Sequence, residues 1–74
     1  MELSDLTRFA VKAFGLRHAG IQLRDAIGYE DDDEVRAELT VAASTIARAQ
    51  SRAENQYAEA RRRAAALAHA ALES

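Results

Sequence analysis

The chain has 74 residues and a net charge of −2, so it forms one small domain at most, and its charge argues against a polyanion as the main partner. It contains no cysteine, which excludes disulfide bonds and thiolate metal sites, and no proline. Apolar residues make up 49% of the chain, but 18 of them are alanine, so few large side chains are available for a core. No apolar run approaches the roughly 18 residues of a membrane span, and charges near the start argue against a signal peptide.

The first predicted element is a helix over about residues 5–27. Ser4 is a candidate N-cap, and the apolar residues that follow recur at the helical period on a face roughly 180° wide. Arg17 and Arg24 interrupt this face, so they must pair with an acid or extend to solvent. One edge of the face, which a single neighbouring helix cannot also cover, carries Leu3, Phe14 and Ile21.

Two glycines fall inside this helix, where each costs ~1 kcal/mol relative to alanine. They are Gly15 and Gly20. A hinge or a close helix contact is one interpretation of them. We favour the other, in which both are tolerated on a packed helix face.

A turn is predicted over residues 28–32. Gly28 follows the last periodic residue, as a left-handed C′ cap would. The aspartates at 31–33 then offer an N-cap and first-turn acids for a second helix. Residues 30–40 carry six acids and one arginine, a local charge of −5, but they lack the internal glycine and spaced ligands of a calcium loop. The predicted role of this acidic run is therefore to start a helix.

The second predicted element is one long helix over about residues 33–71. No glycine or proline interrupts it, and alanine is the strongest helix former. A break near residues 44–51 is the alternative, although nothing in the sequence punctuates the helix there. Apolar residues recur every 3.6 residues on average and form what we call the alanine stripe: Val35, Leu39, Ala42, Ile46, Ala49, Ala53, Tyr57, Ala60, Ala64, Leu67 and Ala71.

The short turn predicts an all-α fold, in which residues 1–74 form a single antiparallel helical hairpin. With the turn near residue 30, opposing residue numbers should sum to roughly 60, so that Leu23 meets Leu39 and Leu16 lies near Ile46. The short first helix should end opposite about residue 57. At 1.5 Å per residue, about 20 Å of the long second helix would then project beyond it.

The projecting stripe and the uncovered edge of the first helix predict a binding surface, because exposed apolar patches usually mark interaction sites. We expect association into a helical bundle, either with another copy of the chain or with another helical protein. The predicted function is a non-catalytic interaction or assembly module, with no cofactor, no metal and no enzymatic activity. The expected partner contacts are Leu3, Phe14, Ile21, Tyr57, Leu67 and Leu72.

Two other functions remain as alternatives. A small dimeric nucleic-acid-binding regulator would use Arg61, Arg62 and Arg63, although consecutive helical residues point 100° apart and nucleic acid is therefore disfavoured as a partner. An inhibitor or antitoxin-like protein that masks another protein is the third interpretation. The abundance of alanine and of arginine over lysine is typical of GC-rich bacterial or phage genes. Together with the small size and the incomplete burial, this composition fits a phage or bacterial structural subunit or adaptor, which we expect in the cytoplasm or within a phage particle.

Overall fold

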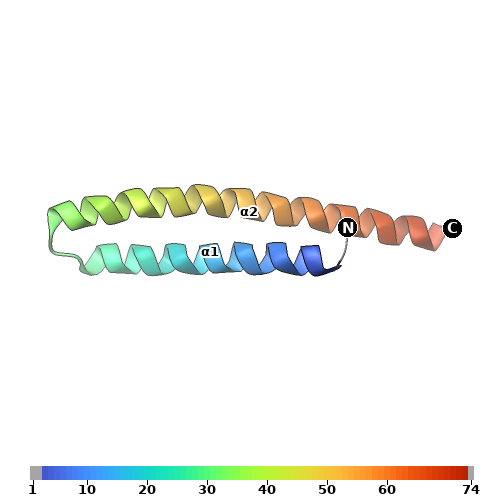
Figure 1. Cartoon of the computed structure of the whole chain (residues 1–74), viewed down its shortest axis with the longest axis horizontal. Helices are drawn as coiled ribbons and strands as arrows, with labels where there is room; N and C mark the ends of the chain where they lie inside the picture. The colour runs from blue at the N-terminus through green and yellow to red at the C-terminus, as the bar shows by residue number, and fades with distance from the viewer. Residues whose placement is uncertain (1–2, 74) are drawn as a thin grey trace.

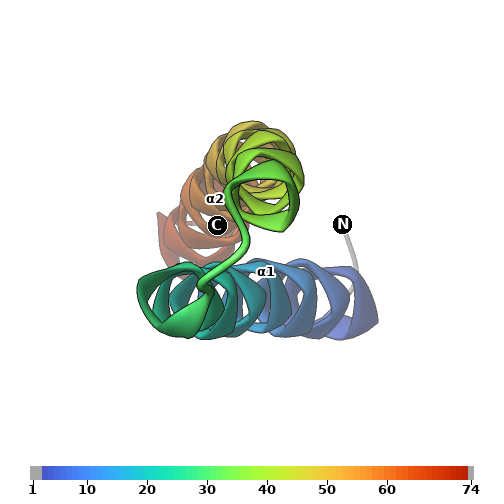
Figure 2. The ribbon, with the colours of Figure 1, turned by 90° about the vertical axis from the view of Figure 1, so that its left-hand side faces the viewer.

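The chain folds as two antiparallel helices that lie side by side (Figures 1 and 2). The computed structural model describes residues 3–73, with side chains from residue 5 onward. Helix α1 spans Leu3–Tyr29 and helix α2 spans Asp33–Glu73. The molecule measures 62 × 14 × 14 Å, and its radius of gyration is 17.4 Å. A compact domain of this length would have a radius of gyration of about 11 Å, so the hairpin is a rod.

Helix α1 is longer than the sequence predicted. It contains 27 residues, so the expectation of a short first helix over 5–27 is wrong. Gly28 and Tyr29 belong to the helix, and no glycine in the described chain has a positive φ, so the predicted left-handed cap at Gly28 is also wrong. The helix closes with a hydrogen bond from the Glu30 N–H to the Ile27 carbonyl, 3.3 Å long. A short i→i+3 bond of this kind tightens the last turn without needing a glycine in the left-handed region.

The acidic run starts α2 as predicted. The Asp32 carboxylate accepts hydrogen bonds from the backbone N–H groups of Glu34 and Val35, at 2.9 and 3.1 Å. These bonds satisfy two of the donors that a helix start leaves without helical partners. Asp33 and Glu34 occupy the first turn, where the helix dipole favours negative charge.

Helix α2 runs without a break through residues 44–51, which confirms the continuous helix. The alanine stripe is the face that packs on α1, since its members from Leu39 to Ala64 are all buried or half-buried. Ala53 and Ala60 are the most enclosed, at 0% and 1% exposure.

Small residues define how closely the two helices pack. The residues that the described chain buries are Ala13 and Gly20 of α1 and Ala53 and Ala60 of α2. None of the large side chains described is fully buried. Helix α1 is continuous through Gly15 and Gly20. Gly20 is buried on the face that packs on α2, as favoured, whereas Gly15 is exposed, so the prediction that both glycines lie on a packed face is wrong for Gly15. The hairpin therefore has a seam of small residues in place of a conventional core.

The register of the helix pair differs from the prediction. The pairs Gly20 with Ile46, Arg17 with Glu54 and Lys12 with Gln56 are in contact, and their numbers sum to 66, 71 and 68 instead of roughly 60. Helix α2 begins beyond the end of α1, because the turn extends past the end of α1 before α2 starts (Figure 1). Side chains also tilt toward the N-terminus of their own helix, so contacts in an antiparallel pair join residues of higher number.

Helix α2 continues past the start of α1 (Figure 1). It is 14 residues longer, equivalent to about 21 Å at 1.5 Å per residue, so the predicted difference in length is confirmed. The prediction that α2 leaves α1 at about residue 57 is wrong, because Ala60 is buried against α1. The shifted register and the earlier start of α1 extend the packed stripe to Ala64, which is half-buried, while Leu67 is exposed.

Candidate helix-docking face

One side of the hairpin gathers exposed apolar and aromatic side chains from both helices. We call it the Phe14 face and define it by Ala10, Phe14, Arg17 and Ile21 of α1 with Glu54, Tyr57 and Leu72 of α2. Phe14 is 65% exposed, and Ile21 follows it by two helical turns on the same side. Leu72 lies five turns after Glu54, which places it on the same side of α2.

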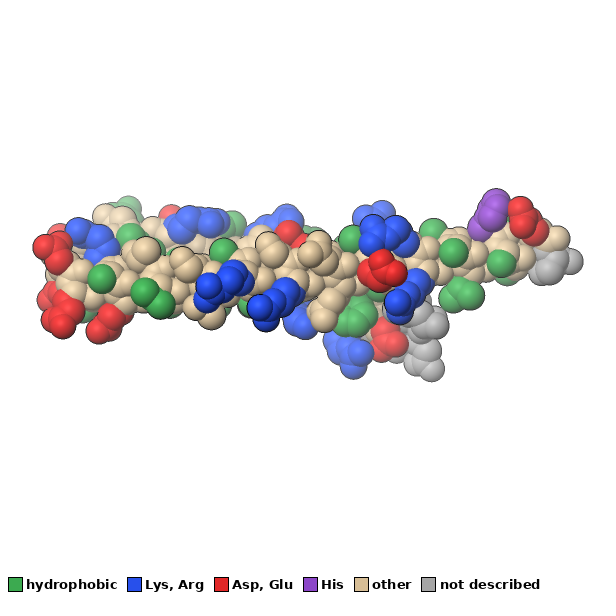
Figure 3. Space-filling view, turned by 90° about the horizontal axis from the view of Figure 1, so that it is seen from above, with side chains coloured by type: hydrophobic (Ala, Val, Ile, Leu, Met, Phe, Trp, Pro, Cys, Tyr) green, Lys and Arg blue, Asp and Glu red, His purple; other side chains and the backbone are tan. Residues whose placement is uncertain are grey.

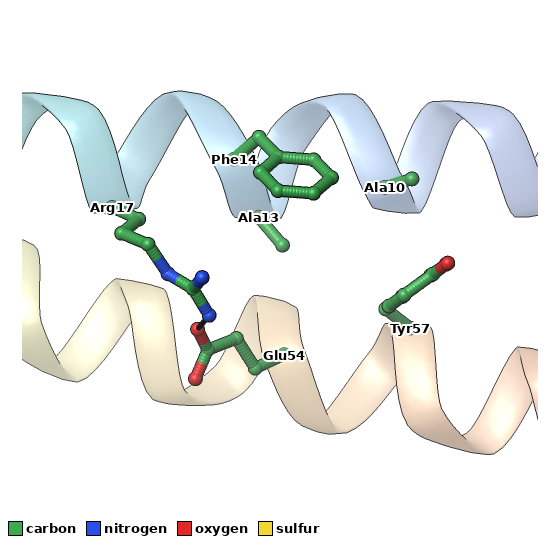
Figure 4. A pocket seen from close by; sticks show the side chains of 6 residues that line it. All are labelled: Ala10, Ala13, Phe14, Arg17, Glu54 and Tyr57. Carbon is green, nitrogen blue, oxygen red and sulfur yellow. Dashed lines mark hydrogen bonds and ion pairs between the residues drawn. The ribbon is translucent and has the colours of Figure 1, made fainter.

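A shallow depression of about 80 Å³ lies at the middle of the Phe14 face. Ala10 and Ala13 line it from α1, and Tyr57 bounds it from α2 (Figure 4). The Phe14 ring stands beside this depression on the α1 side. A protruding ring and a recess therefore lie next to each other on one surface.

An ion pair across the helices closes the other end of the depression. The Arg17 guanidinium donates to the Glu54 carboxylate over 2.8 Å, as drawn in Figure 4, so of the two outcomes predicted for Arg17 the structure shows pairing with an acid. Gln50 donates to the same carboxylate oxygen at 3.2 Å. The hydrogen bond from Arg17, followed by that from Gln50, lowers the pKa of Glu54 below its ordinary value. The charges on this part of the face thus neutralise each other.

The two aromatic rings of the face each carry an arginine. The Arg17 guanidinium carbon lies 6.0 Å from the centre of the Phe14 ring, and that of Arg61 lies 5.7 Å from the centre of the Tyr57 ring. Tyrosine, phenylalanine and arginine are the residue types enriched at protein interfaces. The face has this composition without any fully buried charge.

The structure brings two of the predicted contact residues together and places two more on the same side. Phe14 and Tyr57 line one depression, whereas Ile21 lies two turns after Phe14 and Leu72 lies about 22 Å beyond Tyr57 along α2. Leu67 is exposed but lies apart, near Asp5 and Arg63 where α1 begins. Leu3 belongs to α1, and its side chain is outside the described residues.

The opposite side of the hairpin is more polar. Lys12 donates to the Gln56 side-chain oxygen over 2.9 Å, and Gln56 also lines a groove with Phe9, Glu59 and Arg63. Arg8 pairs with Asp5 at 3.1 Å. This side therefore presents charges and amides around its one half-buried phenylalanine, in contrast with the Phe14 face.

The arginine triplet does not form one basic surface. Arg62 and Arg63 both pair with Glu59, at 2.7 and 3.5 Å, while Arg61 lies over Tyr57. The pKa of Glu59 is lowered, chiefly by its hydrogen bond from Arg62. Both pairs have the i, i+3 and i, i+4 spacings at which opposite charges meet on one helix face.

Sequence reasoning missed two features of the site. The incorrect register hid the pairing of Glu54 with Arg17 across the two helices. Val11 is another exposed apolar residue of α1, one turn before Phe14. Its spacing of three residues from Phe14 was a signal that could have placed it at the edge of the face.

Across residues 3–73, no three histidine, cysteine or acidic side chains are grouped so that they could bind a metal ion. Neither helix is apolar enough over 18 residues to span a membrane within that range. Comparison with protein-family models, curated proteins and solved structures found no match to this chain.

Proposed function

We propose that this chain is a non-catalytic assembly module, a structural subunit or adaptor that works by packing its Phe14 face against helices of another chain. The observation that carries this proposal is the placement of Phe14. A large aromatic ring is 65% exposed beside a recess, while the residues that the hairpin does bury are alanine and glycine. Burying one such ring is worth roughly 1.5–3 kcal/mol, which is large for a chain of this size.

The length difference between the helices supports the same function. The end of α2 projects beyond α1 with Leu67 and Leu72 exposed, so the rod offers apolar surface at its open end as well as on its side. A helix that packs along the Phe14 face would extend the two-helix rod into a bundle. In this contact helices would pack against helices, with the aromatic side chains of Phe14 and Tyr57 at the centre.

A photo-crosslinking residue tests this function in cells that produce the chain. We expect position 14 to give discrete adducts of defined mass, because the face is covered by a partner. The matched control is position 48, where Arg48 is exposed on another side of α2. Adducts from position 48 and none from position 14 would contradict the proposal.

Duplex DNA provides a second check. The assembly function predicts no binding at any salt concentration. Tight binding that falls steeply between low and moderate salt, and that is lost when Arg61–Arg63 are replaced, would contradict it and would favour a nucleic-acid-binding regulator.

A further inference from the structure

We infer that the partner of the Phe14 face is a second copy of this chain, which packs in an antiparallel orientation about a twofold axis. This inference rests on the proposed function and names its partner. Three independent features of the structure carry it: the exposed area, the shape of the face and the distribution of charge along the rod.

The exposed area matches one further protein contact. The chain exposes 5698 Å², whereas a compact protein of 8.1 kDa would expose about 4,500 Å². The excess of about 1,200 Å² exceeds the roughly 800 Å² that each partner contributes to a stable interface. Association of two copies would bury the same surface area on each copy. The exposed area of each copy would then approach that of a compact protein of the same mass.

The Phe14 face is self-complementary in shape. A twofold interface uses the same patch on both subunits, so the patch must contain both a protruding group and the recess that receives it. The Phe14 ring and the depression lined by Ala13 and Tyr57 lie side by side at the middle of the face (Figure 4). Two copies can therefore exchange rings without any other change in the hairpin.

The charge along the rod selects the antiparallel orientation. The acids of residues 30–34 lie at the turn and at the start of α2, whereas the arginines of residues 61–63 lie in the second half of α2. Figure 3 shows acidic side chains gathered at one end of the rod. Parallel copies would place one acidic turn beside the other. Antiparallel copies place the two acidic turns at opposite ends of the assembly. The Arg17–Glu54 pair in the middle of the interface is already neutral.

An antiparallel twofold axis that crosses the rod lays α1 on α1 and α2 on α2. When each Phe14 ring enters the depression of the other copy, the axis crosses α1 close to residues 13 and 14, which line that depression. Residue 14 of one copy is then level with residue 13 of the other. Phe14 and Tyr57 would form the apolar centre of the interface.

Sedimentation equilibrium of the purified full chain tests the identity of the partner. We expect a mass of about 16 kDa, twice the 8.1 kDa of the chain. Phe14→Glu should weaken association at least tenfold while leaving the far-ultraviolet circular dichroism unchanged. Val41→Glu is the matched control, because Val41 is 67% exposed but lies on another side of the rod, and it should leave the mass unchanged.

Spin labels at the turn test the orientation. The chain has no cysteine, so Asp31→Cys gives a single label per copy. The antiparallel dimer predicts two labels about 50 Å apart, twice the length of 17 helical residues. A distance below about 20 Å would overturn the antiparallel arrangement.

A monomer at all concentrations would overturn the inference. If photo-crosslinks from position 14 to a different protein were nevertheless found in cells, the proposed function would stand and only the choice of partner would fail. Absence of both the dimer and the crosslinks would refute both proposals.

Discussion

Replacing Gly20 with alanine should stabilise the hairpin, although this glycine lies in the seam between the helices. A Cβ atom at position 20 would lie 3.7 Å from the Gln50 side-chain oxygen and 3.8 Å from the Ile46 Cγ2 atom, which are ordinary van der Waals distances. The gain in helix propensity is ~1 kcal/mol, and burial of a methyl group adds up to about 0.8 kcal/mol. The free energy of unfolding should therefore rise by about 1–2 kcal/mol.

Thermal and urea denaturation followed by circular dichroism would measure this gain. A rise of 1 kcal/mol shifts the melting temperature of a chain this long by roughly 4–8 °C. Gly15→Ala is the matched control, because no atom lies within 4 Å of a Cβ there and only the propensity of ~1 kcal/mol applies. A melting temperature that falls for Gly20→Ala and rises for Gly15→Ala would show that the helices approach more closely than described, and would refute the packing.

Three further substitutions test separate parts of the structure. Ala53→Asp places a carboxylate where the exposed fraction is 0%, so it should lower the free energy of unfolding by about 3–5 kcal/mol and abolish helicity. Asn55→Asp, on the exposed surface, should change that free energy by less than about 0.5 kcal/mol. Equal melting curves for the two variants would refute the alanine stripe as the packed face. The pKa of Glu54 in the folded chain is below its ordinary value of 4.5, so the ionised carboxylate stabilises the fold at neutral pH. This stabilisation is lost as the pH falls below 4.5 and through the folded pKa. Glu54→Gln should therefore lower the melting temperature at pH 7 and have less effect at pH 3, and an equal effect at both would argue against the pair with Arg17. Gly28→Ala should raise the melting temperature, because Gly28 is helical with open space at its Cβ position, whereas a left-handed glycine would make the same change destabilising.

The second helix and its packed face could be predicted from the sequence because both depend on local properties. The absence of glycine and proline after residue 33 permits one long helix, and the 3.6-residue recurrence of alanine marks a single side of it. The N-cap could also be predicted, since only a side chain with an acceptor at residues 31–33 can reach the free N–H groups. Asp32 has this role in the structure.

The register and the end of the first helix could not be predicted in the same way. A glycine after an apolar repeat is typical of a helix end, but Gly28 continues the helix, so the turn contains three residues instead of five. The path of that turn sets how far α2 starts beyond α1, and no residue type encodes this offset. The Arg17–Glu54 pair follows from the register, so it was hidden by the same error.

If a second copy of the chain covers the Phe14 face, the melting temperature must depend on chain concentration, because association stabilises only the folded, assembled state. Over a hundredfold range of concentration we expect the melting temperature of the natural chain to rise by about 5–10 °C and that of Phe14→Glu to stay constant. A cooperative transition of the natural chain at one temperature for every concentration would show that the hairpin is complete alone, and would rule out the dimer.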